Sequence, residues 1–203
     1  MISAGRTRVT QQERSTARQQ LMRDTAARLL IDEGPSGVSH RRVASAAGLP
    51  TGSATYYFPS KAALYEAAVA AAEDLRVAAA TERAESLPQR ERGAAATARL
   101  LFETFYAPDL RPDVVHVRLE PMLDATRTPG LAEIMRASRP QLLTALRTVL
   151  RRCGYTAVAD GPDLELLATT IDAGLLYANG SGEDDPIEAA CSFVARLLEL
   201  ASR

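Results

Sequence analysis

Apolar side chains recur three and four residues apart along most of the chain, and β-branched runs typical of strands are sparse. This spacing is typical of amphipathic helices that bury one face. The first helix is expected to begin at a Thr10-x-x-Glu13 capping box. It should end at Gly34-Pro35, because Gly tolerates a left-handed stop and Pro cannot continue the helix. The pattern therefore predicts an all-α protein.

Two short helices are expected next, and helices that only pack in a hydrophobic core are usually longer. Ser39 is a good N-cap for a helix that Gly48 stops, and a third helix is predicted over about Thr51–Phe58. Two short helices joined by a tight turn containing Gly are the signature of a helix-turn-helix. Ser60 then caps a fourth helix that runs to about Ser86.

Five further helices are predicted after residue 88, which makes about nine in all. They cover about Ala94–Ala107, Asp113–Ala125 with a bend at Pro121, Pro129–Cys153 with a kink at Pro140, Asp163–Ala178, and a last helix with Asp185 as N-cap and Pro186 in its first turn. The last two carry more apolar positions than one side of a helical bundle needs, which predicts a two-fold dimer through both of them. The apolar positions are Leu164, Leu167, Ile171, Leu175, Leu176, Ile187, Val194, Leu197 and Leu198.

The composition, with 46% hydrophobic and 24% charged residues, is that of an ordinary soluble globular protein. Cys153 and Cys191 make neither a disulfide framework nor a metal-ligand spacing, which favours a reducing cytoplasm. The apolar run Ala67–Ala72 is too short to span a bilayer, and the first fifteen residues have no apolar stretch of the kind found in signal peptides, so no signal peptide is expected. No catalytic, phosphate-loop or dinucleotide motif is present. We therefore expect no membrane, metal or cofactor and no enzymatic activity.

The net charge of −1 hides an asymmetry along the chain. Residues 1–61 carry nine basic and four acidic side chains, a net charge of +5, and the remainder carries a net −6. A basic segment on an acidic body is consistent with a first domain that meets a polyanion. A solvated charged surface would give the same count.

A helix-turn-helix places its second helix in the major groove of DNA. Hydroxyls at the start of that helix reach base edges, while tyrosines, basic groups and the next helix N-terminus suit phosphates. The alternative is that the adjacent aromatics are core. Phe58 is expected there, but neighbours on a helix point about 100° apart, so Tyr56 and Tyr57 cannot both be buried. The candidate DNA contacts are Ser39, His40, Arg41, Thr51, Gly52, Ser53, Thr55, Tyr56, Tyr57 and Lys61.

The helix ending "IDEG", the second helix "VSHRRVASAAGL", the recognition helix "G-S-x-x-YYF" and the start "PSKAAL" occur in this order between about Gln19 and Leu64. Together they resemble the N-terminal DNA-binding domain of the tetracycline-repressor (TetR) family. The resemblance implies an all-helical homodimeric repressor of about nine helices, with the last two forming a four-helix dimer interface. Helices five to eight would then enclose a ligand pocket.

The resemblance also implies the domain organisation. Residues 10–65 would form a three-helix DNA-binding domain, joined by the fourth helix to a ligand-binding and dimerisation domain over residues 66–203. Three positions depart from the family pattern. Pro50 stands where a capping Ser is usual, so the recognition helix should begin at Thr51. Thr55 stands where Tyr is common, and Ala62 replaces the common acidic residue.

Candidate ligand contacts lie in the second half of the chain. His116 and Glu120 are i, i+4 neighbours and form either a helical pair or part of a pocket wall. Asp172 and Tyr177 face either the pocket or the dimer seam. Three aromatic residues of the fifth helix serve either as generic core or as a ligand cage, namely Phe102, Phe105 and Tyr106.

The function expected is a ligand-responsive transcriptional regulator that represses by binding a palindromic operator on double-stranded DNA as a homodimer. A small-molecule effector would release it. The alternative from another class is a helical small-molecule-binding protein or enzyme that has no DNA function, and an activator is a narrower rival. Salt-sensitive, saturable DNA binding separates the first reading from the alternative.

Overall fold

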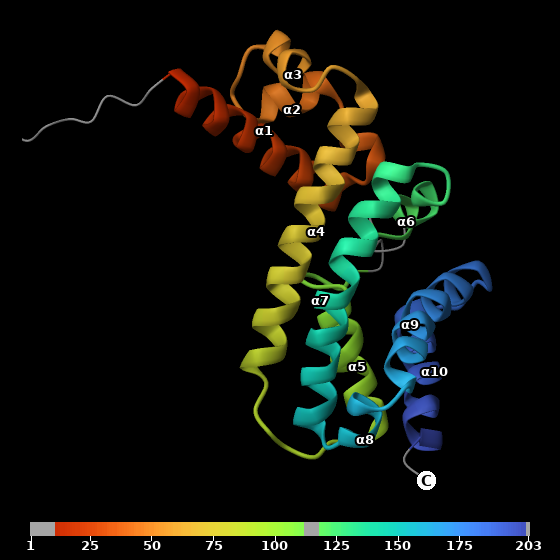
Figure 1. Cartoon of the computed structure of the whole chain (residues 1–203). Coiled ribbons are helices and arrows are strands. Elements are labelled where there is room, and N and C mark those ends of the chain that lie inside the picture. Colours follow the sequence, from red (N-terminus) through yellow and green to blue (C-terminus); the bar gives the residue numbers. More distant parts are fainter. Residues whose placement is uncertain (1–10, 112–117, 202–203) are drawn as a thin grey trace, which may run out of the picture. The chain divides into compact units, whose positions relative to one another are not determined.

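The structure is a computed structural model that describes residues 11–111 and 118–201 (Figure 1). Within these residues helices are the sole regular elements, so the all-α prediction is confirmed. The described residues form ten α-helices and one 3-10 helix: α1 (Gln11–Glu33), η1 (Pro35–Gly37), α2 (His40–Ala46), α3 (Thr51–Tyr57), α4 (Lys61–Ser86), α5 (Ala94–Phe105), α6 (Glu120–Ala125), α7 (Pro129–Cys153), α8 (Thr156–Asp160), α9 (Asp163–Gly180) and α10 (Pro186–Ala201). The chain divides into two compact units, residues 1–71 and 72–203.

In the first unit, α1, α2, α3 and the start of α4 enclose a small apolar core. Val38 and Val43 flank the N-cap Ser39 and are both buried, as expected for a hydrophobic staple. Small side chains at Ala44 and Ala54 let α2 and α3 pack closely. The largest buried side chains of this core are Met22, Leu30, Phe58 and Leu64.

The turn between α2 and α3 depends on a left-handed residue. Gly48 has φ 66°, a conformation that a side chain disfavours. The Leu49 amide donates to the Ala44 carbonyl at 2.9 Å, which closes the C-terminus of α2. Pro50 precedes α3 and its side chain makes no capping hydrogen bond, so α3 begins at Thr51 as predicted.

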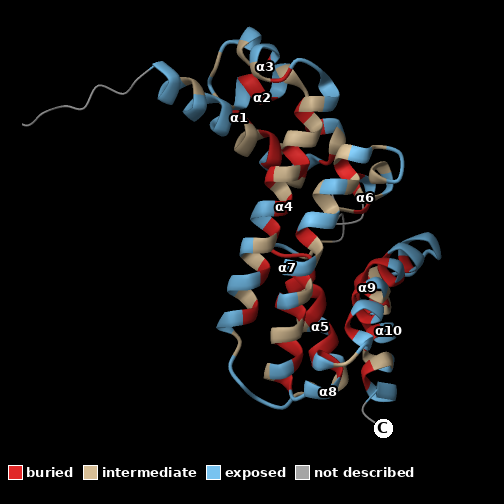
Figure 2. Ribbon diagram, viewed as in Figure 1, coloured by how far each residue is buried: buried red, intermediate tan, exposed pale blue. Residues whose placement is uncertain are grey.

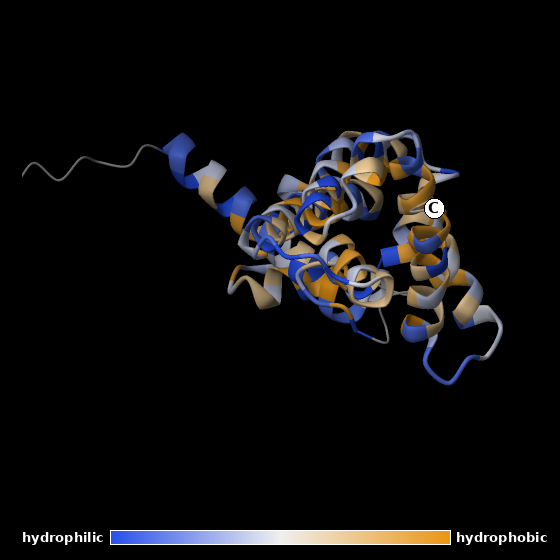
Figure 3. Ribbon diagram, turned by 90° about the horizontal axis from the view of Figure 1, so that it is seen from below, coloured by the Kyte–Doolittle hydropathy of each residue, from blue (hydrophilic) through white to orange (hydrophobic). Residues whose placement is uncertain are grey.

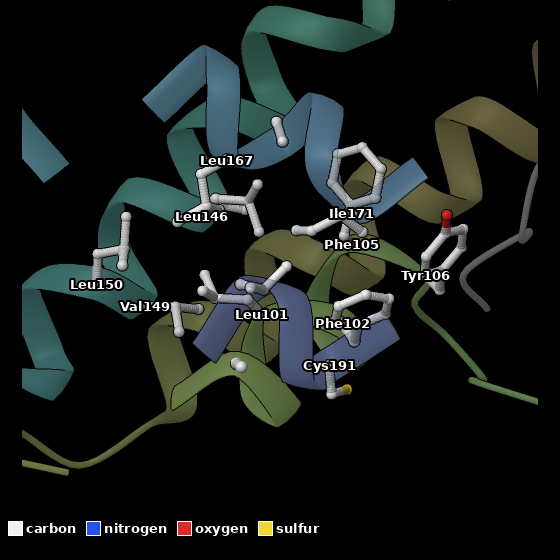
Figure 4. Packing of buried hydrophobic residues seen from close by; sticks show 14 of the residues in the cluster. Leu101, Phe102, Phe105, Tyr106, Leu146, Val149, Leu150, Leu167, Ile171 and Cys191 are labelled. Atoms are coloured by element: carbon white, nitrogen blue, oxygen red, sulfur yellow. The ribbon is translucent and has the colours of Figure 1, made fainter. Parts of the chain in front are cut away.

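In the second unit, α5 packs against both α7 and α10, and α10 also packs against α9. Figure 2 shows that these helices turn their buried faces toward one another. Leu101, Phe102 and Phe105 of α5 belong to one buried apolar cluster with Leu146 and Leu150 of α7 (Figure 4). Burial of such a large side chain contributes about 1.5–3 kcal/mol to stability.

The helices near the C-terminus are largely apolar, whereas the start of α1 is hydrophilic (Figure 3). Gly174 lets α9 and α10 approach closely, because a Cβ there would lie 3.2 Å from Phe193 Cδ2 and 3.8 Å from Ala190 Cβ. A side chain at this position would therefore require the Phe193 ring to move by a few tenths of an ångström. Among the described residues, no helix combines the length and apolarity that a membrane span requires.

The predicted helix boundaries hold for α4, α7 and α10 within one or two residues. Ser60 Oγ caps α4 by accepting from the Ala63 amide, and Asp185 Oδ1 accepts from the Ile187 and Glu188 amides of α10. α7 continues without a break through Pro140. The five-residue α8 was not predicted, because one turn and a half is too short to show a helical period.

In the second unit one prediction is covered only in part, and another needs correction. The helix expected over 113–125 is described only as α6, Glu120–Ala125, and residues 113–117 lie outside the described residues. The choice of dimer residues was wrong in detail. Ile171 and Val194 are fully buried within their own chain, where they pack in the core with Leu175 and Leu198. Periodicity finds the apolar face of a helix but does not say which neighbour covers it.

Candidate functional site

The exposed face of α3 forms one candidate site, in the first unit. Thr51, Gly52 and Thr55 are exposed, and 78% of Tyr56 is accessible to solvent. Ser53 is half-buried. The helix is held from beneath by the buried side chains of Ala54 and Phe58. The buried and exposed positions alternate as a short amphipathic helix requires, so α3 presents hydroxyls and one aromatic ring to solvent.

The two tyrosines of α3 differ in their surroundings. Their rings meet edge to face with centroids 5.0 Å apart. The Tyr57 hydroxyl lies 3.2 Å from Ser15 Oγ of α1, in hydrogen-bonding range, and this contact orients the half-buried ring. Tyr56 points away from the unit. The expectation that the pair cannot both be buried is met by this arrangement.

The start of α2 holds α3 in place. His40 Nε2 lies 2.8 Å from the carbonyl oxygen of Phe58, the residue that ends α3. Ser39 Oγ accepts from the Arg42 amide and caps α2. The Arg42 side chain pairs with Glu33 of α1. These contacts give both residues a positioning role within the fold: the capping role of Ser39 was predicted from its residue type, whereas the contact of His40 with Phe58 was not.

Two basic side chains remain available at this site. Arg41 is exposed and has no ion-pair partner among the residues that the structure covers. Lys61 is exposed at the first position of α4, where the helix N-terminus carries partial positive charge. A phosphate beside Lys61 would therefore meet both a charged amine and the amides of the first helical turn.

A buried charged cluster lies in the second unit. Glu73 and Arg76 of α4 are each 5% exposed, and Glu73 pairs with Arg118. Ser138 of α7 donates to Glu73 Oε2 at 2.5 Å, and Arg76 Nη1 lies 3.5 Å from Glu73 Oε1. Both carboxylate oxygens of Glu73 are thus occupied. Removing either the acid or both arginines would leave unpaired charge in a buried place.

The two arginines of this cluster, unlike Glu73, have polar atoms without a hydrogen-bond partner among the described residues. The Arg76 guanidinium carbon lies 4.9 Å from the centre of the Phe105 ring, a cation–π contact. Its Nε and Nη2 have no hydrogen-bond partner among the described residues, and the same holds for Arg118 Nε. Buried N–H groups are normally paired, so three unpaired cationic donors in one place are unusual.

A second buried pair extends the cluster toward α9. The Tyr106 hydroxyl donates to Asp172 Oδ1 at 2.9 Å, and Asp172 Oδ2 lies 3.7 Å from Arg139 Nη1. Burial raises the pKa of Asp172, against the opposing effect of Arg118 and Arg139 and of the Tyr106 hydrogen bond. The pKa of Tyr106 is raised well above its usual value by burial and by the neighbouring Asp172 charge.

A groove of about 370 Å³ opens beside this pair, a volume within the range of small-molecule sites. Its walls are mainly apolar, and Asp172, Arg139 and Thr169 supply polar groups. The apolar lining residues are Leu119, Met122, Leu123, Ala173 and Leu176. Within the described residues, no group of three acidic, histidine or cysteine side chains could hold a metal ion.

Family models match both parts of the chain. The model for bacterial regulatory proteins of the tetR family matches residues 23–68. The model for the tetracyclin repressor-like C-terminal domain matches residues 88–200, more than half of the chain. The chain belongs to the TetR family. The helix-turn-helix of α2 and α3 is accordingly the DNA-binding element of a transcription regulator.

Solved structures share the fold of this TetR-family protein. A TetR-family regulator from Mesorhizobium loti MAFF303099 is 15% identical with a TM-score of 0.63, over 92% of this chain and 97% of that one. A regulator from Saccharomonospora viridis in complex with choline is 20% identical with a TM-score of 0.59, over 91% and 94%. The multidrug binding protein EbrR complexed with proflavin is 24% identical with a TM-score of 0.55, over 91% and 99%. No curated protein matches the chain.

The predicted ligand residues of this TetR-family protein fall in different places. Phe102 and Phe105 are fully buried in the core, and Phe105 also contacts Arg76. Tyr106 and Asp172 are brought together by a hydrogen bond. Glu120 is exposed on α6, and Tyr177 is exposed on α9, with its ring centroid 6.1 Å from that of Phe193. His116 lies outside the described residues.

Sequence reasoning missed Glu73, Arg76 and Ser138 as site residues. A signal was present in the periodicity of α4. Positions 73, 76, 80 and 84 are three or four apart and share one face, and Ala80 and Ala84 on that face are buried. Charged side chains on an apolar helical face indicate a buried polar site.

Proposed function

We propose that this TetR-family protein is a ligand-responsive repressor that binds a palindromic operator as a homodimer and is released by a small-molecule effector. The observation that carries the proposal is the exposed polar face of α3, which directs Thr51, Thr55 and Tyr56 into solvent above a buried anchor. A recognition helix needs this combination, because its outer face reads DNA while its inner face stays attached to the domain.

The proposed DNA contacts are of two kinds: some read the edges of bases, and others hold the phosphate backbone. Thr51 and Ser53 lie in the first turn of α3, the part of a recognition helix that reaches base edges. Tyr57, Arg41 and Lys61 are proposed to hold phosphates, which fixes the register of the helix but carries no sequence information. Residues 10–65 would thus read DNA, and residues 66–203 would bind effector and dimerise.

A dimer through α9 and α10 is supported by an exposed apolar stripe. Leu166 and Tyr177 of α9 are eleven residues apart, and Phe193 and Leu200 of α10 are seven apart, so each pair shares a helical face. All four side chains are exposed in the single chain. A helix pair that exposes large apolar side chains on one face suits an interface with a second copy. The exposure of Tyr177 favours the dimer seam over the ligand pocket.

The effector site is proposed at the groove beside Asp172 and Tyr106. The groove is large enough for a small organic molecule, and its apolar walls surround a few polar groups, as is typical of ligand sites. Two relatives of this fold have been solved with small organic molecules, choline and proflavin. Both observations support a small-molecule effector for this chain.

DNA from upstream of the coding sequence, labelled with a fluorophore, provides the test. Fluorescence anisotropy should show saturable binding of the full-length protein that weakens steeply with salt, because several phosphates are neutralised. Tyr56→Ala should weaken binding, and Tyr155→Ala, a tyrosine in the second unit, is the control. Equal binding to operator and random DNA at every salt concentration would reject a specific repressor and favour the alternative of a binding protein without DNA function.

A further inference from the structure

In the buried cluster of the second unit, the carboxylates have hydrogen-bond or ion-pair partners for all their oxygens, but the arginines do not have partners for all their N–H groups. Every carboxylate oxygen in the cluster has a partner: Glu73 is contacted by Arg118, Arg76 and Ser138, and Asp172 by Tyr106 and Arg139. Arg76 Nε and Nη2 and Arg118 Nε have no partner among the described residues. The unused hydrogen-bonding capacity of the cluster therefore consists of donors on cations.

These donors are in a place where an unmade hydrogen bond is costly. Arg76 is 5% exposed, so solvent has little access to its guanidinium group. A buried polar group without a partner loses the full free energy of its hydration, and the loss is larger for a charged group. A ligand atom that accepts from Arg76 would recover part of that free energy. A cationic ligand would add repulsion from both arginines, and the carboxylate oxygens of Glu73 and Asp172 already have partners among the described residues.

The groove borders this cluster. Leu119, which follows Arg118 in the chain, lines the groove, as does Arg139, which follows Ser138. Asp172 also lines the groove, and it senses the charges of both Arg118 and Glu73. Two members of the cluster, Asp172 and Arg139, therefore line the groove together with apolar side chains, and Arg118 and Arg76 lie next to that lining within the cluster. A ligand with an acceptor at one end and an apolar body would match both parts.

We propose that the effector is a carboxylate with an apolar chain or ring, whose carboxylate accepts hydrogen bonds from Arg76 and Arg118 and whose apolar part occupies the groove of α6, α7 and α9. The inference rests on the proposed function, because it names the ligand class of the proposed effector site. A carboxylate suits two guanidinium groups better than a neutral carbonyl, since it offers two charged acceptors in the geometry of the guanidinium fork.

The test uses probes that differ in the charge of the head group. Octanoate and 2-naphthoate are the carboxylates, with a chain and a ring as apolar part. Octanamide is the neutral analogue, and octyltrimethylammonium is the cation. Isothermal titration calorimetry on the full-length protein should give tighter binding for at least one carboxylate than for octanamide, and the weakest binding for the cation. Comparison of the two carboxylates tells whether the groove prefers a chain or a ring.

Variants at Arg76 test the assigned contact. Arg76→Gln leaves Glu73 with Arg118 and Ser138 as partners, so the fold should survive. It should weaken carboxylate binding roughly 10- to 100-fold, the range for losing hydrogen bonds to a charged group. Arg76→Lys keeps the positive charge but loses the forked geometry of the guanidinium group, so its carboxylate affinity should lie between that of the wild type and that of Arg76→Gln. Arg151→Gln removes an exposed arginine of α7 that pairs with Asp160, and is the matched control that should bind as the wild type does.

The outcomes separate the two proposals. Tighter binding of the cation, absence of carboxylate binding, or unchanged carboxylate affinity in both Arg76 variants would overturn the ligand class. DNA binding by the wild-type protein without any probe tests the repressor function separately. Operator binding that octanoate and 2-naphthoate leave unchanged, although one of them binds the protein, would contradict the role of the carboxylate as effector while confirming the site.

Discussion

Replacement of Lys61 by Ala should change how operator affinity depends on salt. Lys61 is the sole lysine of the chain, is exposed, and begins α4 at a helix N-terminus. Each phosphate contact contributes about −0.9 to the slope of log affinity against log salt concentration. A dimer loses two contacts, so Lys61→Ala should make the slope less steep by about 1.8.

This change has a measurable consequence for affinity. Between 50 and 200 mM salt, a slope difference of about 1.8 changes the ratio of wild-type to variant affinity by roughly tenfold. The variant should therefore be weakest relative to the wild type at low salt. It should lose affinity alike for operator and random DNA, because a phosphate contact carries no sequence information.

The assay is fluorescence anisotropy on both DNAs across a salt series. Arg151→Ala is the control, since it removes one exposed positive charge from the second unit. Its slope should match that of the wild type. The reasoning is refuted if Lys61→Ala leaves the slope unchanged while altering the preference between operator and random DNA. An independent check is chemical: an amine-reactive reagent should modify Lys61 in the free protein, and operator DNA should protect it.

The remaining predictions concern base recognition, dimer formation and the pH dependence of stability. Thr51→Ala should cost about 1–3 kcal/mol on operator DNA and little on random DNA, and an unchanged preference would show that Thr51 reads no base. Leu166→Arg with Leu200→Arg should yield monomers by light scattering that lose operator binding, whereas Leu123→Arg, an equally exposed leucine of α6, should remain dimeric. A dimer that persists in the double variant would place the interface elsewhere. Asp172→Asn should raise the melting temperature more at pH 7 than at pH 4. Because burial raises the pKa of Asp172 above its usual 3.8, the wild type loses stability as pH rises through the folded-state value, and the neutral amide does not. An equal shift at both pH values would contradict a buried, charged Asp172.

The DNA-binding unit could be predicted from the sequence in considerable detail. Its helices are short and begin and end at local signals: Ser39 and Ser60 are N-caps, Gly48 takes a positive φ, and Pro50 precedes the first residue of α3. Such signals act over three or four residues, so they can be read without knowing the fold. The same holds for the inward position of Phe58, which follows from spacing along one helix.

In the second unit, local sequence signals were not sufficient to predict the packing of the helices. Ile171 and Val194 were expected at a dimer interface, yet the other helices of the same unit bury them completely. Glu73, Arg118 and Ser138 are far apart in the sequence and meet only because α4, α7 and the segment before α6 come together. Local chemistry determines which face of each helix is apolar, but the packing of distant helices decides what covers that face and which buried charges lack a partner.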